Sequence, residues 1–218
     1  MATTTLARNP GLQGMRWRRR ASMSADAFLV VLFSFFTYVY FMRVLDGHFT
    51  SLVFAIEQSV LVGIYLIRRR PFAVTTRLDD WAWATLGGWL SLTYSFLEPG
   101  DVPARVEALG IGLQLAGTVL VMAGFLSLGR SFGIVAANRG LKSQGMYRVV
   151  RHPIYFAHAV TAAGLVVAEF SPAYLALWAA ILFFQVLRIR SEERVLSASS
   201  DYAAYSRRVR WRMIPGLY

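Results

Sequence analysis

Residues 145–155 read G-M-Y-R-V-V-R-H-P-I-Y and place three cationic or titratable side chains, Arg148, Arg151 and His152, beside a proline. A guanidinium group presents a planar fork of donors that matches a carboxylate, so Arg151 can bind a carboxylate ligand. Pro153 disfavours helix at the residue before it and suits the first position of a helix. We therefore expect Arg151 and His152 on a loop that leads into a membrane helix, although such a cluster can also serve only to fix membrane orientation.

A second polar stretch, residues 188–215, contains Arg188 and the acidic pair Glu192 and Glu193. Arg188 and Glu192 are four residues apart, which places them on one face of a helix, about 6 Å apart along its axis. Nothing breaks a helix before Ser197, so the last apolar segment is expected to continue into this stretch. The alternative is a solvated surface pair worth about 0.3 kcal/mol.

The elements that position these residues are apolar. The chain of 218 residues is 56% hydrophobic and 16% charged, more apolar than a soluble domain of this size. Several apolar segments approach the ~20 residues that cross a bilayer. We predict an all-α fold, a polytopic membrane helical bundle of four spans followed by a C-terminal helical hairpin and a cytoplasmic C-terminal helix. The six expected segments are residues 27–42, 52–67, 81–96, 109–128, 153–167 and 173–187.

Polar and small residues add detail to this pattern. Ser24 and Asp26 are the expected N-caps of the first segment. Glu57 lies within the second segment, where a carboxyl group is unusual; we expect it near the outer end of the helix, bonded to Gln58 or reaching the lipid surface. Small residues in segment 109–128 indicate close helix packing in lipid; they are Gly110, Gly112, Ala116, Gly117, Ala123 and Gly124.

The net charge of +11 is distributed as in a membrane protein. If the N-terminus is cytoplasmic, only Arg43 and Arg105 of the 23 lysines and arginines face the other side, which is a strong positive-inside pattern. We expect both termini in the cytoplasm, a bacterial inner membrane, contacts with anionic lipids and no nucleic-acid partner. The N-terminal residues lack the pattern of a cleaved signal peptide. The absence of cysteine excludes disulfides and cysteine-containing zinc sites, and no metal site is predicted.

The two polar stretches together resemble the isoprenylcysteine carboxyl methyltransferase and phospholipid methyltransferase superfamily. The pattern G-x-Y-R-x-x-R-H-P-x-Y is followed by R-x-x-x-E-E-x-x-L, then by Y-x-x-Y-x-x-x-V and a closing I-P. The resemblance covers about the C-terminal half of the chain. It divides the sequence into a basic N-terminus (1–23), N-terminal spans (24–108) and a methyltransferase-like membrane core (109–218). The residues that carry it are Gly145, Tyr147, Arg148, Arg151, His152, Pro153, Tyr155, Arg188, Glu192, Glu193, Leu196, Tyr202, Tyr205, Val209, Ile214 and Pro215.

The resemblance implies an integral membrane enzyme that transfers a methyl group from S-adenosylmethionine, with S-adenosylhomocysteine as product. It implies a lipophilic acceptor that enters from the bilayer, either isoprenylcysteine carboxylate-like or phospholipid amine-like. In such enzymes the cofactor lies at the cytoplasmic face, enclosed by the loop and the tail. By resemblance, Arg188 and Glu192 belong to the catalytic centre. The cofactor-binding residues it implies are Arg151, His152, Tyr155, Glu193 and Tyr147.

These residue types suit that chemistry. Arg151 can bind the carboxylate of the cofactor, and Glu192 or Glu193 can bind its ammonium group. His152 can donate to the carboxylate or the ribose, and Tyr155 or Trp211 can contact the sulfonium or the adenine. An amine acceptor requires a base such as Glu192, whereas a carboxylate acceptor requires only a cation such as Arg188.

Two other classes of function share some of these features. A membrane sterol or steroid reductase has a related loop and acidic tail but uses NADPH. Its loop typically carries asparagine before the tyrosine and an acid soon after, where this chain has Ile154 and residues 156–158, F-A-H. This difference favours methyl transfer. A non-enzymatic scaffold or transporter is the third possibility. Against it, the sequence shows no buried charge pairs across the first four segments, apart from Glu57.

Overall fold

The computed structural model describes residues 10–68, 73–75, 77–131, 137–138, 141–197 and 199–218. The described chain is almost entirely helical, which confirms the predicted all-α class. Within it, the one β element is an antiparallel pair of two-residue strands, in which Ala73 faces Asn138. The elements are α1 (Pro10–Leu45), α2 (Ser51–Ile67), β1 (Ala73–Val74), α3 (Leu78–Trp89), η1 (Leu90–Phe96), α4 (Ala104–Leu128), η2 (Gly129–Ser131), β2 (Ala137–Asn138), η3 (Gly145–Arg148), α5 (Pro153–Ala168), α6 (Pro172–Leu196) and α7 (Ser200–Arg208).

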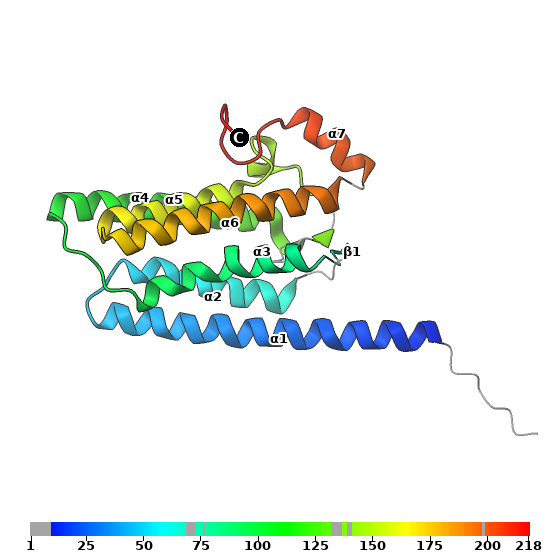
Figure 1. Ribbon diagram of the computed structural model, residues 1–218, viewed down its shortest axis with the longest axis horizontal. Coiled ribbons are helices and arrows are strands. Elements are labelled where there is room, and N and C mark those ends of the chain that lie inside the picture. The colour runs from blue at the N-terminus through cyan, green and yellow to red at the C-terminus, as the bar shows by residue number, and fades with distance from the viewer. Residues whose placement is uncertain (1–9, 69–72, 76, 132–136, 139–140, 198) are drawn as a thin grey trace, which may run out of the picture.

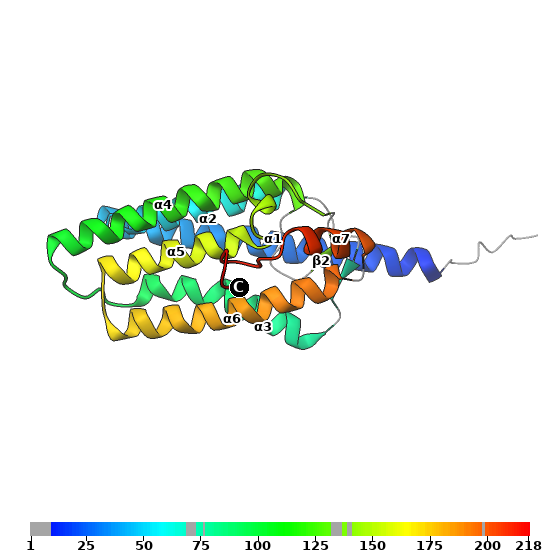
Figure 2. The ribbon, with the colours of Figure 1, turned by 90° about the horizontal axis from the view of Figure 1, so that it is seen from above.

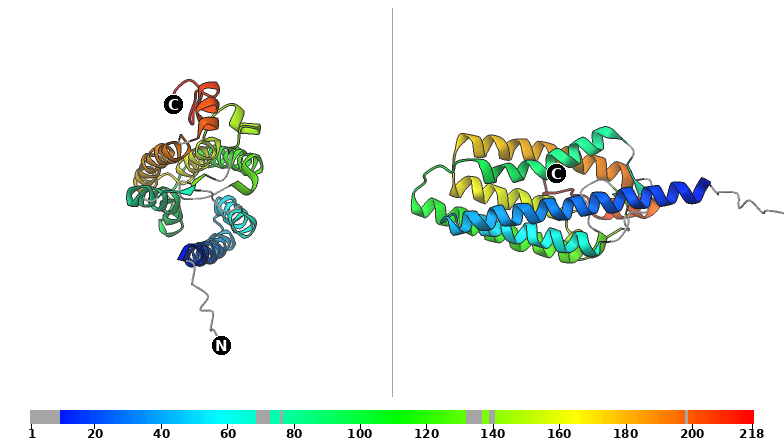
Figure 3. Two further views of the ribbon diagram at one scale, coloured as in Figure 1. Left: turned by 90° about the vertical axis from the view of Figure 1, so that its right-hand side faces the viewer. Right: turned by 90° about the horizontal axis from the view of Figure 1, so that it is seen from below.

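The long helices lie side by side along one axis, and α7 with the C-terminal tail lies on one side of the bundle, next to α4, α5 and α6 (Figures 1 and 2). Seen end-on, α4 packs against α5, α3 against α6 and α1 against α2 (Figure 3). The α1–α2 hairpin forms the side of the bundle that is farthest from α7. Helix α5, which begins at the loop whose residues could do chemistry, lies between α4 and α6 (Figure 2).

The α4–α5 contact depends on glycine, as the small residues of segment 109–128 indicated. A Cβ added at Gly117 would lie 2.5 Å from the backbone nitrogen of Thr161, and one at Gly110 would lie 2.4 Å from that of Ala168. Glycine in membrane helices permits this approach of two backbones. Gly112 differs, because a Cβ there would meet nothing within 4 Å. The prediction is therefore confirmed for Gly110 and Gly117 but not for Gly112.

Each predicted apolar segment forms a helix, although two boundaries differ. The predicted N-caps Ser24 and Asp26 are wrong, because α1 begins at Pro10, and the side chain of Asp26 instead pairs with Arg68 at the end of α2. Proline suits a first helical position, so a helix can begin there in spite of later capping residues. The third segment is α-helical only to Trp89 and continues as the 3-10 helix η1.

In the described part of the chain, three helices are long and apolar enough to cross a membrane, those at Asp26–Leu45, Ala104–Leu128 and Pro172–Leu196. The helices α2 and α5 are apolar but shorter, with 17 and 16 residues. The structure thus supports an integral membrane protein, while the predicted number of spans stays a prediction. The beginning of α1, the end of α2, the end of α6 and α7 all lie toward one end of the bundle (Figure 1), and the sequences of these four parts are rich in arginine.

The last apolar segment continues without a break into the polar stretch, as predicted. Its helix, α6, begins with Ser171 as N-cap, whose hydroxyl accepts from the backbone N–H of Tyr174, and with Pro172 in the first turn. It ends at Leu196, directly before Ser197. Similarly, Pro153 begins α5, and His152 is its N-cap residue with a non-helical backbone, at φ −129° and ψ 59°. Both polar stretches are therefore held on the ends of membrane helices.

Candidate active site

The loop before α5 is joined to the C-terminal tail by backbone hydrogen bonds. The N–H of Arg151 donates to the carbonyl of Trp211 at 3.0 Å, and the N–H of His152 donates to that of Arg212 at 2.7 Å. Nearby, the hydroxyl of Tyr205 on α7 donates to the carbonyl of Tyr147 at 2.7 Å. These bonds connect residues about 60 positions apart in the chain, so the loop and the tail form one structure.

Residues of both the loop and the tail contact the side chain of Glu193. Its Oε2 accepts from Nε of Arg212 at 2.7 Å, and its Oε1 accepts from the hydroxyl of Tyr202 at 3.1 Å. Arg151 Nε lies 3.1 Å from the same Oε1, where opposite charges attract although the N–H is not aligned for a hydrogen bond. His152 Nε2 is 3.4 Å away. The Glu193 carboxylate thus interacts with Arg151, His152 and Arg212 in a region that is largely shielded from solvent.

The tyrosines around Glu193 remain neutral donors. Burial raises the pKa of Tyr205 to about 12. Burial also raises the pKa of Tyr202, and the nearby negative charge of Glu193 adds to this shift. The pKa of Tyr147 is raised by burial and, secondarily, by the charge of Glu192. Neutral phenols keep the proton that a hydrogen bond requires, so the bonds from Tyr202 and Tyr205 persist over the physiological pH range.

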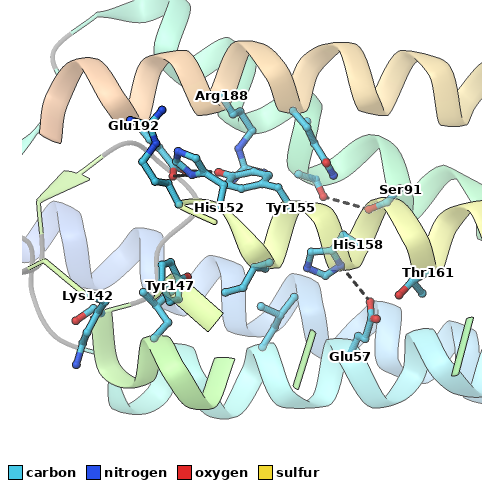
Figure 4. A pocket seen from close by; sticks show the side chains of 18 of the residues that line it. Glu57, Ser91, Lys142, Tyr147, His152, Tyr155, His158, Thr161, Arg188 and Glu192 are labelled. Carbon is cyan, nitrogen blue, oxygen red and sulfur yellow. Dashed lines mark hydrogen bonds and ion pairs between the residues drawn. The ribbon is translucent and has the colours of Figure 1, made fainter. Parts of the chain in front are cut away.

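Glu192 points the other way, into a cavity of about 210 Å³ (Figure 4). Its Oε1 accepts from the hydroxyl of Tyr155, and its Oε2 lies 3.7 Å from Nδ1 of His152. The guanidinium carbon of Arg188 lies 5.0 Å from the centre of the Tyr155 ring, a cation–π distance. One end of the cavity therefore presents a carboxylate, a guanidinium, an imidazole and a phenol within a small volume.

The structure brings six of the seven predicted site residues to the wall of this cavity. The seventh, Glu193, does not line it but lies behind Arg151 and His152. Arg188 and Glu192 both face the cavity, as their spacing of four predicted. Their chemical roles stay predictions. The six lining residues are Tyr147, Arg151, His152, Tyr155, Arg188 and Glu192.

The cavity also contains two residues that the sequence reasoning did not place there. Glu57 on α2 is 3% exposed, and its Oε2 lies 3.5 Å from Nδ1 of His158 on α5. Glu57 lies in the second turn of α2, near the end of the helix where it was expected. The expectation that it reaches the lipid surface or bonds Gln58 is wrong, because its side chain is buried and faces His158. A signal was present in the sequence, since His158 follows Tyr155 by three residues and so shares its helix face.

The residues at the ionic end fit S-adenosylmethionine. Its amino acid part carries both charges, and this end supplies Arg151 and Glu192 as partners of opposite sign. Its sulfonium is a cation, and the ring of Tyr155 already lies against a cation, the guanidinium of Arg188. For a metal, the described part of the chain offers no group of three or more His, Cys, Asp or Glu side chains that could bind one.

Comparison with known proteins gives one positive result. Residues 106–200 match the family model of the phospholipid methyltransferases. The match includes nearly all of α4, the loop, α5 and all of α6, and it leaves out α1, α2, α3 and nearly all of α7. No curated protein matches the chain. Residues 106–200 are therefore similar to the phospholipid methyltransferases, which agrees with the resemblance to this superfamily of integral membrane methyltransferases.

Proposed function

We propose that this protein is a membrane methyltransferase that uses S-adenosylmethionine and acts on a lipophilic acceptor. The observation that carries the proposal is that His152, Tyr155, Arg188 and Glu192 line one cavity at the end of a membrane bundle, within the region that matches the family. When bound, the cofactor supplies a methyl group on a positively charged sulfur. The cavity walls lie partly among apolar helices, so a lipophilic acceptor can reach it from the bilayer.

In this proposal the ionic end of the cavity binds and orients the cofactor. Arg151 and His152 bind its carboxylate, and Glu192 binds its ammonium group. The hydrogen bond from Tyr155 and the nearby imidazole of His152 hold the Glu192 carboxylate in place. Glu193 acts as a positioning residue, because it neutralises Arg151 and fixes the loop against the tail without lining the cavity.

Alignment is the main contribution that the chain makes to catalysis. Holding donor and acceptor in line converts a bimolecular reaction into an effectively unimolecular one, which can supply about 7 kcal/mol or more of the barrier. Arg188, whose guanidinium lies against Tyr155, is close to where the acceptor and the sulfonium would meet. We propose that Arg188 and Glu192 are the catalytic pair and that this end of the bundle faces the cytoplasm, as the arginines in the sequences of the helix ends there indicate.

The test combines binding with turnover. The purified protein should bind S-adenosylhomocysteine in a calorimetric titration and should not bind NADPH, which a reductase would prefer. With S-adenosylmethionine labelled on its methyl group, it should transfer the label to extracted membrane lipids. Glu192→Gln and Arg188→Ala should lose transfer by about 100-fold. The matched control is Arg190→Ala, because Arg190 is an exposed arginine on the same helix. Binding of NADPH alone, or full transfer by Glu192→Gln, would contradict the proposal.

A further inference from the structure

The second end of the cavity, away from Arg188 and Glu192, contains a carboxylate and an imidazole. Glu57 Oε2 lies 3.5 Å from His158 Nδ1, and both side chains line the cavity (Figure 4). Glu57 belongs to α2, outside the region that matches the family, whereas His158 lies within it. The N-terminal helices thus contribute a charged group to a site that the family match describes only in part.

A buried carboxylate among apolar helices is costly unless it has a function or a partner. Here His158 contacts one oxygen of Glu57, while Glu57 Oε1 has no hydrogen-bond partner among the described residues. The same is true of Oε1 of Gln58 and Oε1 of Gln185, and all three residues line the cavity. Buried oxygens without donors favour a bound molecule that brings its own N–H or O–H group.

The imidazole of His158 is held in a defined orientation. Glu57 lies on its Nδ1 side, and the ring of Phe125 meets it edge to face at a centroid distance of 6.2 Å. A carboxylate on one ring nitrogen holds the proton there and leaves the other nitrogen as a base. Nε2 of His158 is therefore the atom suited to accept a proton from a molecule in the cavity.

His158 is also close enough to the ionic end to act on the same molecule. It follows Tyr155 by three residues on α5, so it lies on the same face, about 4.5 Å farther along the helix axis. Tyr155 itself bonds Glu192 and lies against Arg188. A small polar head group placed between His158 and Tyr155 would thus contact both ends of the cavity.

We propose that Glu57 and His158 form a proton-accepting pair for a lipophilic acceptor whose attacking atom is an N–H or O–H group. The proposal rests on the proposed methyltransferase function. As the acceptor atom forms its bond to the methyl carbon and the carbon–sulfur bond breaks to leave a neutral thioether, the proton of that atom moves to Nε2 of His158. The Glu57 carboxylate stabilises the resulting imidazolium. A carboxylate acceptor has no proton to lose, and Glu57 would repel it.

Three variants of the full-length protein test the pair. Glu57→Gln keeps the shape of the side chain and removes its charge, and His158→Gln removes the base. Glu107→Gln is the matched control, because Glu107 is exposed in the first turn of α4. The first measurement is the affinity for S-adenosylhomocysteine, which should change by less than about threefold in all three variants and shows that each is folded. The second is methyl transfer to dodecylamine, to 4-dodecylphenol and to dodecanoate.

We expect transfer to the amine or the phenol. For that acceptor, Glu57→Gln and His158→Gln should lower kcat by about 100-fold with little change in KM, because a general base contributes on this scale. The control should equal the wild type. The pair has no such role if both variants retain wild-type kcat, if dodecanoate is the sole acceptor, or if neither proton-bearing probe is methylated. If the wild type fails to bind S-adenosylhomocysteine, the proposed function itself is wrong, which is a different result.

Discussion

The guanidinium of Arg188 lies over the ring of Tyr155, with its central carbon 5.0 Å from the ring centre. The two residues come from α6 and α5, and the hydroxyl of the same tyrosine donates to Glu192. Tyr155 therefore holds both the cation and the carboxylate of α6 on one side of the cavity. Because Tyr155 contacts Arg188 through its ring and Glu192 through its hydroxyl, it sets the distance between these two charged side chains.

Tyr155→Phe should separate these two contributions. The ring remains for Arg188, but the hydrogen bond to Glu192 is lost. Because a hydrogen bond to a charged group contributes roughly 1.5–3 kcal/mol, we expect affinity for S-adenosylhomocysteine to fall by about tenfold or more. Calorimetric titration measures this, with Tyr38→Phe as control, since Tyr38 is exposed on α1. Equal affinities in the two variants would show that Glu192 does not require this bond.

Glu193→Gln should loosen the joint between loop and tail. The change removes the negative charge that faces Arg151 and Arg212, and a shielded charge without its partner is destabilising. The backbone amides of Arg151 and His152 donate to tail carbonyls, so their hydrogen exchange reports the joint directly.

We expect these two amides to exchange about tenfold faster or more in Glu193→Gln. Asp201→Asn is the control, because Asp201 is an exposed acid in the first turn of α7. Exchange in helix α4, which does not form the joint, should stay the same. Unchanged exchange at Arg151 and His152 would mean that the backbone bonds alone hold the tail.

Gly117→Ala should destabilise the α4–α5 contact. The new Cβ would lie 2.5 Å from a backbone nitrogen of Thr161, which cannot move away as a flexible side chain can. Overpacking of this kind costs about 1–3 kcal/mol, so thermal unfolding in detergent should occur at a lower temperature. Gly112→Ala on the same helix meets nothing within 4 Å and should be neutral or stabilising. Similar losses in both variants would contradict the close approach at Gly117.

The pH dependence of Tyr205 gives a further test. Burial raises its pKa to about 12, above the value of about 10 for a tyrosine in an unfolded chain. A raised pKa means that its contribution to stability is complete below pH ~10 and is lost as the pH rises through the folded value. The tyrosinate absorbance of the wild type minus that of Tyr205→Phe should therefore titrate near pH 12. A difference curve centred near pH 10 would show that Tyr205 is not buried in the joint.

The convergence of the loop and the tail could be predicted from the sequence. His152 and Glu192 each follow or precede an apolar segment at the same end of the bundle, so membrane topology alone brings them close. The continuation of α6 past Leu187 was equally predictable, because no breaker occurs there. These predictions need only the local sequence and the rule that successive membrane helices run in opposite directions.

The inner end of the cavity could not be predicted in the same way. The meeting of Glu57 and His158 depends on which face of α2 turns toward α5, and neither helix is amphipathic enough to indicate that face. The partners of Glu193 depend on the path of the tail after α7, which follows no periodic pattern. The start of α1 at Pro10 likewise shows that a proline favoured at the first position prevailed over capping residues farther along.

The order in which the chain is made gives the tail a role in biogenesis. A ribosome adds Glu193 after five of the six long helices, and it adds Arg212 later still. Until then the loop arginine and histidine have neither their acidic partner nor the carbonyls of Trp211 and Arg212 to receive their amides. The ionic end of the cavity is thus completed only after the first five long helices have been made, because its loop depends on contacts with residues near the C-terminus.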